Sequence, residues 1–195
     1  SPLRRNSDTF ALYVSDAGAN TVRKFRLEGA YEQREILGAG FPITGQAPED
    51  PGFEQPYDVV VDSKGDLFVL DRLNGRVGRF YSDGTPHDAT GVEGRNFIHP
   101  EGVRVLDRPE SLAIDDSDNL YVADTARNRI RAFTTDQPWT ANQPTEFMML
   151  TPAAPNDLLV PRGVAVSRDG ATLYVADSQH HRILAFDTST YDPAT

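Results

Sequence analysis

The sequence predicts an all-β chain assembled from a repeated antiparallel unit. A fourteen-residue stretch recurs four times without a gap, at residues 12–25, 67–80, 120–133 and 173–186. In each copy, an alternating run of aliphatic and aromatic residues ends on an aspartate, about four polar or small residues follow, and a second alternating run closes on phenylalanine. This order is typical of a strand, a tight turn and a second strand. The copies start 55, 53 and 53 residues apart, so each unit must hold further strands, and the chain is expected to form an array or a propeller.

The first unit consists of this hairpin and one outer strand. Residues 1–9 are polar and carry no alternation, so we expect a lead-in there. Residues 32–37 follow the hairpin as a short, charged strand of the kind found at sheet edges. Residues 38–55 are rich in glycine, proline and acidic residues and are expected to be a long connector. The first unit therefore lacks an apolar strand before its hairpin.

The other three units each begin with an apolar strand that follows a proline. These inner strands are expected at residues 56–62, 109–115 and 161–167, and they read as strands buried on both sides. A polar turn then leads into each hairpin. Residues 100–105 also resemble the start of a buried strand, so they compete with 109–115 for the inner strand of the third unit, and spacing favours 109–115.

The outer strands complete units of four antiparallel strands. They are expected at residues 102–106 in unit two and 145–150 in unit three. Unit four stops after Phe186 and ends in a tail, residues 188–195, without a fourth strand. Four-stranded units of this kind are the blades of propellers.

The pattern Pro-x-Gly-Val-Ala-Val followed by Leu-Tyr-Val-Ala-Asp-x-x-x-Asn-x-Ile-x-x-Phe resembles the NHL repeat. The resemblance covers residues 10–187 and implies β-propeller blades at 10–40, 56–106, 109–150 and 161–187. Single positions depart from the pattern. Thr21 stands where the other units have an arginine, and Gly75 and His181 stand where the other two units have an asparagine.

Composition excludes several kinds of function. The chain has 195 residues, 38% of them hydrophobic, and a formal net charge of -10, so a nucleic-acid partner is disfavoured. It contains no cysteine, which excludes disulfides and thiolate metal sites. No apolar run has the length of a membrane span. The start at Ser1-Pro2 fits a processed or excised piece, and an extracellular or periplasmic location is slightly favoured.

The repeated aspartates are expected to be structural. A carboxylate at the end of the second strand can accept hydrogen bonds from N–H groups of its own turn and pair with an arginine five residues later. A catalytic site is normally built once, whereas this arrangement is built four times. The residues of this structural set are Asp16, Asp71, Asp124 and Asp177 with Arg76, Arg129 and Arg182.

The densest acidic cluster is Asp115, Asp116 and Asp118, which could supply oxygen ligands to calcium. It lacks the central glycine and the distal glutamate of an EF-hand loop, and equivalent turns in other units contain fewer acids. A plain hairpin turn is therefore favoured, and we expect no cofactor.

Catalytic groups are sparse. The histidines lie in connectors and turns, none lies on an inner strand, and no Gly-x-Ser-x-Gly motif occurs. The family resemblance implies that related propellers with peptide-amidating lyase or lactonase activity need metal ligands converging on a central channel. No such histidine set is found here, so a metal-dependent lyase or hydrolase, with its site elsewhere in the full protein, is the alternative rather than the favoured function.

The favoured function is a binding scaffold. The turns after the second strands and the connectors into the first strands emerge on one side of a propeller, and arginine with exposed aromatic residues is typical of an interaction face. We expect this loop face to bind a protein or a saccharide; a solvated rim without a partner is the plain alternative. The candidate residues are Tyr57, Arg72, Asn74, Arg127, Asn128, Arg162, Gln179 and His180.

Counting the strands gives three and a half to four blades. Unit one has no inner strand and unit four has no outer strand, so we expect an open arc, or a fragment of a larger propeller of about six blades. Apolar faces are expected at both ends, with Val14 and Phe25 at one end and Val164 and Val166 near the other. Such faces need cover, either from further blades of the same protein or from another chain.

Overall fold

The fold consists of antiparallel sheets joined in chain order. The computed structural model describes residues 11–26, 33–37, 52–82, 84, 97–98, 106–135, 146–152 and 155–190. These residues form four sheets, in each of which neighbours in sequence are neighbours in space. Sheet 1 contains β1 (Ala11–Asp16), β2 (Thr21–Arg26) and β3 (Gln33–Leu37); sheet 2 contains β4 (Pro56–Val61), β5 (Leu67–Asp71), β6 (Arg76–Phe80) and β7 (Phe97–Ile98). Sheet 3 contains β8 (Ser111–Ile114), β9 (Asn119–Asp124), β10 (Arg129–Thr134) and β11 (Glu146–Leu150); sheet 4 contains β12 (Pro161–Val166), β13 (Thr172–Asp177) and β14 (Arg182–Asp187).

Three short 3-10 turns are the helical elements of the described residues. They are η1 (Thr125–Arg127), η2 (Ser178–His180) and η3 (Thr188–Thr190). The part of the chain that the structure describes has no helix with the length and hydrophobicity of a membrane span.

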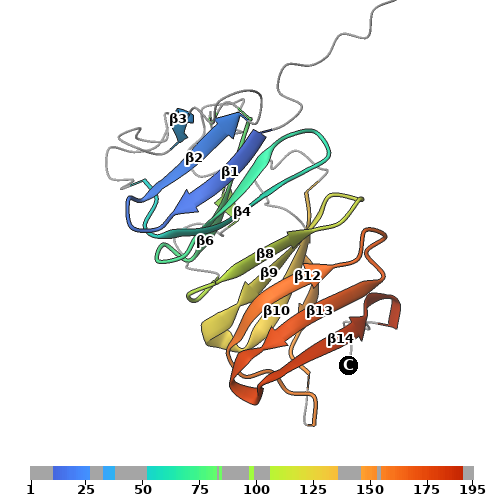
Figure 1. Cartoon of the computed structure of the whole chain (residues 1–195). Helices are drawn as coiled ribbons and strands as arrows, with labels where there is room; N and C mark the ends of the chain where they lie inside the picture. The colour runs from blue at the N-terminus through green and yellow to red at the C-terminus, as the bar shows by residue number, and fades with distance from the viewer. Residues whose placement is uncertain are drawn as a thin grey trace, which may run out of the picture.

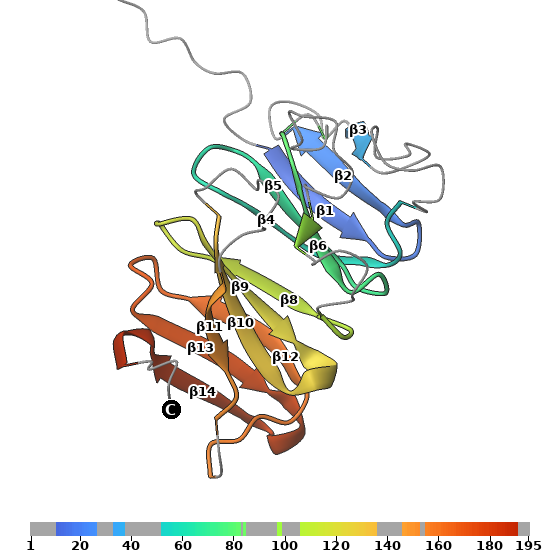
Figure 2. The ribbon, with the colours of Figure 1, turned by 180° about the vertical axis from the view of Figure 1, so that it is seen from behind.

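The sheets are stacked in the order of the sequence, with sheet 1 and sheet 4 at opposite ends (Figures 1 and 2). The first strands of sheets 2, 3 and 4, which are β4, β8 and β12, lie beside one another, and β1 lies beside β4. These three strands form the inner edge of the stack.

All four predicted hairpins are present with equivalent registers. Asp71 pairs with Arg76, Asp124 with Arg129 and Asp177 with Arg182, and in sheet 1 Asp16 pairs with Thr21. The last turn residue is left-handed in every hairpin: φ is 55° at Asn20, 63° at Gly75, 54° at Asn128 and 51° at His181. Glycine and asparagine adopt this conformation most readily, which explains why they occupy three of these positions.

The position of the outer strand of sheet 2 differs from the prediction. We expected it at residues 102–106, but β7 at Phe97–Ile98 pairs with Val77 and Gly78 of β6 instead. Residues 101–105 lie outside the described residues, and Leu106 is fully buried in a bend between sheets 2 and 3. The inner strand of sheet 3 is β8, which lies within the favoured range 109–115.

The other outer strands occur where they were expected. β3 and β11 fall within residues 32–37 and 145–150. Within the described part of the chain, no strand precedes β1 in sheet 1 and none follows β14 in sheet 4. The predicted lead-in, and residues 38–51 of the predicted connector, lie outside the described residues, as do residues 191–195 of the tail.

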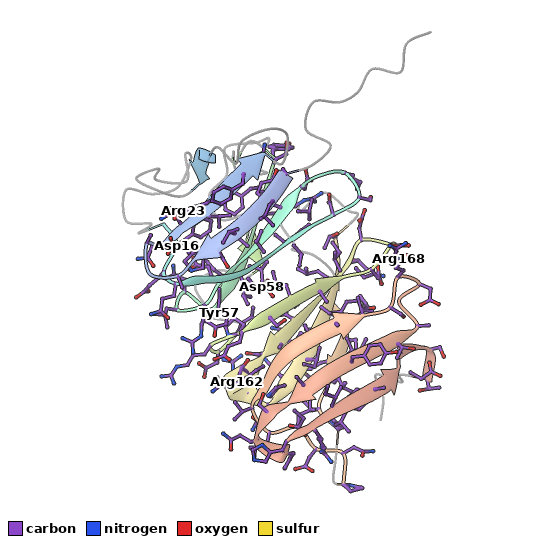
Figure 3. The ribbon with its side chains drawn as sticks, in the orientation of Figure 1. Asp16, Arg23, Tyr57, Asp58, Arg162 and Arg168 are labelled. Atoms are coloured by element: carbon purple, nitrogen blue, oxygen red, sulfur yellow. The ribbon has the colours of Figure 1, made fainter. Side chains whose placement is uncertain are left out.

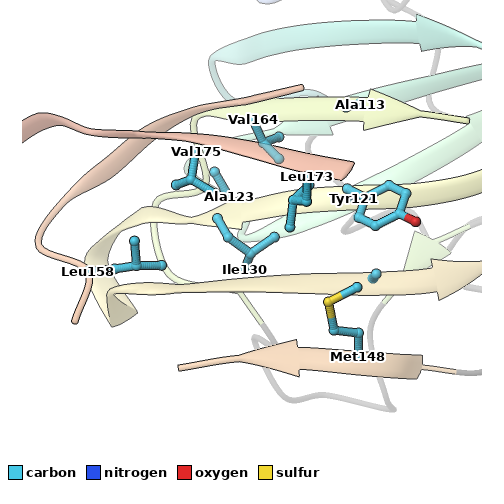
Figure 4. Packing of buried hydrophobic residues seen from close by; sticks show 10 residues of the cluster. Ala113, Tyr121, Ala123, Ile130, Met148, Leu158, Val164, Leu173 and Val175 are labelled. Carbon is cyan, nitrogen blue, oxygen red and sulfur yellow. The ribbon is translucent and has the colours of Figure 1, made fainter. Parts of the chain in front are cut away.

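The core is divided into three apolar layers, one between each pair of consecutive sheets. Side chains of sheet 1 and sheet 2 form the first layer, around Val22, Leu67 and Phe80. The second layer joins sheets 2 and 3, and the third joins sheets 3 and 4 (Figure 4). Every residue of β5 and β6 is buried because sheet 2 has a neighbour on each face.

The two end faces are apolar, but one of them is made of different residues from those predicted. Leu12 and Val14 of sheet 1 are 50% and 39% exposed. Val164 is buried and Val166 is partly buried, because both point back toward sheet 3. Side chains alternate along a strand, so the outward face of sheet 4 instead carries Tyr174 and Ile183.

Candidate loop-face binding site

A buried carboxylate at the end of the second strand holds each of sheets 2, 3 and 4 together. The Oδ2 atoms of Asp71, Asp124 and Asp177 accept from the Nε atoms of Arg76, Arg129 and Arg182 at 2.7, 2.7 and 2.8 Å. Their Oδ1 atoms accept from the backbone N–H groups of Glu54, Asp107 and Leu159 at 2.7, 2.6 and 2.7 Å. We call these three arrangements the Asp–Arg pins.

The backbone partners of the pins differ from the prediction. The N–H groups belong to the connector that leads into the inner strand, and not to the turn of the aspartate itself. In sheet 1, Asp16 does bind its own turn, through the N–H of Ala19 at 3.0 Å. Thr21 stands in the arginine position there, and Asp16 pairs with Arg23 at 2.7 Å instead.

The pKa values of two pin aspartates, Asp71 and Asp177, are shifted in opposite directions. Burial raises the pKa of Asp71, although Arg76 and the hydrogen bonds from Asn74 and Glu54 oppose the rise. Burial also acts to raise the pKa of Asp177, but hydrogen bonds from Leu159, Arg182 and His180 outweigh it, and the net shift is downward. The direction therefore depends on whether hydrogen bonds compensate for the loss of solvent.

Three of the predicted binding residues take part in this framework. Asn74 donates from Nδ2 to Asp71 Oδ2 at 2.8 Å and to the Gly52 carbonyl at 3.0 Å. His180 Nδ1 lies 2.8 Å from Asp177 Oδ2. Asn128 Oδ1 accepts from the N–H of Val160 at 2.8 Å. These side chains fix the loops in place.

Three other predicted residues belong to a row of contacts across sheets 2, 3 and 4. The guanidinium of Arg72 lies 5.4 Å from the centre of the Tyr57 ring. Arg72 Nη2 also donates to Glu110 Oε1 at 3.0 Å, and Arg162 Nη1 lies 3.6 Å from Glu110 Oε2. We call Tyr57, Arg72, Glu110 and Arg162 the inner rim, because three of them occupy the position after the proline that precedes or opens an inner strand.

The ends of the inner rim are open to solvent while its centre is buried. Tyr57 is 46% exposed and the side chain of Arg162 is 57% exposed, whereas that of Glu110 is 6% exposed. Glu110 is thus a buried anion shared by two arginines. Figure 3 shows Tyr57 and Arg162 on the same side of the stack, at the starts of their strands.

In sheets 2 and 3, the next residue along the inner strand contacts the inner strand of the following sheet. Asp58 Oδ2 accepts from the N–H of Leu112 at 2.8 Å, and Ser111 Oγ accepts from the N–H of Val164 at 3.3 Å. Burial raises the pKa of Asp58, and hydrogen bonds from Leu112, Val59 and Ser111 oppose part of the rise. The strands below the inner rim are therefore held in register with one another.

A cavity of about 260 Å³ opens beside the inner rim. Arg72 forms part of its wall, together with Glu54, Asp107 and Arg108 of the connectors. The remaining candidates, Arg127 and Gln179, are exposed in the turns η1 and η2.

Two carboxylates of the acidic cluster in the β8–β9 turn accept hydrogen bonds, one from that turn and one from Ser63 of sheet 2. Asp115 Oδ1 accepts from the N–H groups of Ser117 and Asn119, each at 2.9 Å. Asp118 accepts from the N–H and the hydroxyl of Ser63, and Asp116 is exposed. Among the described residues, no group of three or more histidine, cysteine or acidic side chains is arranged to hold a metal ion.

Sequence reasoning missed Glu110 and Gln55. Glu110 shares its position after the proline with Tyr57 and Arg162, which was a usable signal. Gln55 accepts from Arg72 Nη1 at 3.2 Å, and no repeated position marks it.

The comparisons with known proteins agree with this fold. The family model described as the NHL repeat matches residues 106–133 and 158–186, which contain most of the first three strands of sheet 3 and sheet 4. No curated protein sequence matches the chain.

Several solved structures are similar across nearly the whole chain. A catalytically inactive virginiamycin B lyase from Staphylococcus aureus with quinupristin is 17% identical, with 95% of this chain and 54% of that chain covered and a TM-score of 0.55. A nidogen/laminin complex is 19% identical, with 92% and 56% covered and a TM-score of 0.62. A putative 6-phosphogluconolactonase from Bacteroides fragilis is 18% identical, with 95% and 48% covered and a TM-score of 0.61. This chain thus spans about half the length of these structures, and at such identities the likeness shows a propeller-like fold alone.

Proposed function

The chain carries NHL repeats at two places, and from this premise we propose that it is a non-catalytic β-propeller scaffold that binds a protein or saccharide partner through its loop face. The inner rim is the part of that face that would hold the partner.

The observation that carries the proposal is the continuous row of Tyr57, Arg72, Glu110 and Arg162 across three sheets. An exposed tyrosine and an exposed arginine at the ends of the row supply the residue types that dominate binding energy in interfaces. Their neighbours are fixed by buried contacts, so little conformational entropy would be lost on binding.

The charge of the inner rim favours an acidic partner. Two arginines and one glutamate give a local excess of positive charge on a chain whose net charge is -10. Arginine forms paired hydrogen bonds with carboxylates. We therefore propose a carboxylate-bearing partner, either an acidic protein segment or an acidic saccharide.

The four sheets are further proposed to be four blades of an open arc. Their order along the stack and the positions of sheets 1 and 4 at opposite ends support this arrangement. The coverage of about half of each similar solved structure is consistent with a larger propeller. The alternative of a metal-dependent lyase or hydrolase concerns residues elsewhere in the full protein and stays a prediction.

Isothermal titration calorimetry with a hexaglutamate peptide and with oligogalacturonate would test the binding proposal and separate the two partner classes. Arg162→Ala should weaken binding by about tenfold, because a hydrogen bond to a charged group is lost. Arg168→Ala is the matched control, since it removes an exposed arginine near the opposite end of β12 (Figure 3). Equal effects of the two variants, or no binding of either probe, would contradict the proposal.

A further inference from the structure

The turn of sheet 2 lacks an asparagine that joins one unit to the next in two other sheets. In sheet 1, Asn20 Oδ1 accepts from the N–H of Gln55 at 2.9 Å. In sheet 3, Asn128 Oδ1 accepts from the N–H of Val160 at 2.8 Å. Each of these asparagines thus binds the residue before the proline that opens the next inner strand. Gly75 stands at the equivalent position of sheet 2 and has no side chain to make this bond.

The residue that would bind the missing asparagine is Arg108. Its φ of 47° is left-handed, as are those of Gln55 and Val160 at the equivalent positions, 55° and 54°. Those two N–H groups have an asparagine acceptor, whereas the N–H of Arg108 donates to no other described residue. A donor that is held in place without a partner favours an acceptor from a bound molecule.

The cavity of about 260 Å³ beside the inner rim lies at this place, since Gly75 and Arg108 both line it. Arg72, Glu54 and Asp107 belong to the same wall. The side chains of Glu54, Asp107 and Arg108 are exposed and pair with no other described residue. The N–H groups of Glu54 and Asp107 donate to pin aspartates at 2.7 and 2.6 Å, which fixes the connectors. The cavity therefore presents unpaired charges of both signs on an ordered backbone.

These charges are not part of the repeat. The equivalent junction between sheets 3 and 4 has Thr125 and Val160 in place of the two arginines, and Leu159 in place of Asp107. The two sheets are joined there without the charges, so the fold does not require them. A small number of charged groups around one cavity, built once in the chain, is typical of a ligand site.

We propose that this cavity binds one uronic acid residue of an acidic saccharide, an inference that deepens the proposed function and rests on it. One carboxylate oxygen takes the position that the asparagine amide oxygen has in the other two junctions, and it accepts from the N–H of Arg108. The guanidinium groups of Arg72 and Arg108 balance the charge of the carboxylate.

The two acidic side chains of the wall select the saccharide over an acidic peptide. Glu54 and Asp107 can accept hydrogen bonds from sugar hydroxyls. A glutamate side chain has no hydroxyl to donate, so its carboxylate would face two like charges without compensation. The volume agrees with one sugar ring, because pockets for larger, drug-sized ligands measure about 300–1,000 Å³.

Restoring the asparagine tests the site. Asparagine adopts left-handed φ values readily, so Gly75→Asn should stay folded, which urea denaturation would establish. Its amide should bind the N–H of Arg108 and fill part of the cavity, and calorimetry should show oligogalacturonate binding weakened by about tenfold or more. His181→Asn is the matched control, because it restores the asparagine at the equivalent turn of sheet 4, where φ is 51°, and it should bind like the wild type.

Arg108→Ala is a second test that leaves the cavity open. It removes an exposed guanidinium and should weaken oligogalacturonate binding by about tenfold. The wild type should bind oligogalacturonate more tightly than hexaglutamate. If Arg162→Ala weakens oligogalacturonate binding but neither Gly75→Asn nor Arg108→Ala does, the proposed function stands and the cavity site is overturned. Tighter binding of hexaglutamate would overturn the uronic acid assignment, and no binding of either probe would overturn both proposals.

Discussion

The carboxylates of the Asp–Arg pins each satisfy an arginine and a backbone N–H group in a buried environment. Asp124 is fully buried, and its two oxygens accept from Arg129 at 2.7 Å and from Asp107 at 2.6 Å. A buried donor that loses its acceptor costs free energy that solvent cannot restore. The pins are therefore expected to contribute to stability more than exposed acids do.

The Asp124→Ala variant should lower the free energy of unfolding by about 1–3 kcal/mol, because Arg129 and the Asp107 N–H lose their acceptor. Urea denaturation measures this change. Asp116→Ala removes an exposed carboxylate of the same chain and should change stability by less than about 0.5 kcal/mol. Equal losses for the two variants would show that the buried pin is not stabilising.

Asp58 should make stability depend on pH. Its pKa is raised above the ordinary value of 3.8 by burial, so the folded protein binds this proton more tightly than the unfolded chain does. The stabilising contribution is full below pH 3.8 and is lost as the pH rises through the folded pKa. Relative to Asp58→Asn, the wild type should become less stable as the pH rises above 4 in a series of urea denaturations. A difference that is constant with pH would contradict this expectation.

Turns between strands also act across sheets. Gly170, in the turn between β12 and β13, has a φ of +74°, and a Cβ atom there would lie 2.7 Å from Asp115 Oδ2 of sheet 3. Gly65 has the equivalent place in sheet 2 and a φ of +88°, but a Cβ atom there would meet nothing within 4 Å. Alanine variants of these two glycines therefore separate the cost of backbone strain from the cost of a contact between sheets.

Gly65→Ala should cost about 1–2 kcal/mol, the strain of a left-handed conformation. Gly170→Ala should cost about 1–3 kcal/mol more, because the buried Asp115 must move away from its partners. Thermal and urea unfolding of both variants measures the difference. Identical losses of stability would mean that the contact between the β12–β13 turn and Asp115 rearranges at no cost in free energy.

The alternation of side chains was enough to predict the hairpins, since that signal is local and repeats four times. The three inner strands needed the spacing of the units as well, because residues 100–105 resemble the start of a buried strand as much as residues 109–115 do. It was not enough for β7, which has only two residues and pairs with β6 across a long connector. Leu106 looked like part of a strand because it is apolar, but it is buried in a bend. Apolar character alone does not distinguish a residue of a strand from a residue buried in a bend.

The position of a sheet in the stack decides how much a given residue of the repeat contributes to stability. Ile130 and Ile183 are equivalent in the repeat, yet one is fully buried and the other is 75% exposed. Ile130→Ala should cost about 2–5 kcal/mol through the cavity it leaves. Ile183→Ala should cost less than about 0.5 kcal/mol, because that side chain is mostly exposed. Urea denaturation of both variants checks the contrast, which equal losses would refute.

The loop face shows how far the sequence could predict the site. The repeat places Tyr57, Arg72 and Arg162 on one side of the stack, and this much follows from the order of strands and turns. The hub of their contacts, Glu110, comes from a third sheet, and its pairing depends on how the inner strands are spaced. Asn74 and His180 were assigned to binding because turns are exposed, but their side chains fold back onto the pins.

The span of each pin bears on how such a chain could grow. A pin joins the hairpin of one unit to the connector just before the inner strand of that unit, and the bonded residues are only 17 or 18 positions apart. A duplicated gene segment would therefore inherit a complete polar lock with each new unit, and no matching change would be needed in the units on either side. A new unit must share with its neighbours the apolar pattern of its two faces and the polar contacts that cross the boundary, such as those of Glu110 with Arg72 and Arg162. Elongation by tandem duplication is thus compatible with the buried aspartates of sheets 2, 3 and 4, because each of them finds its arginine and its backbone N–H group without contacting a neighbouring unit.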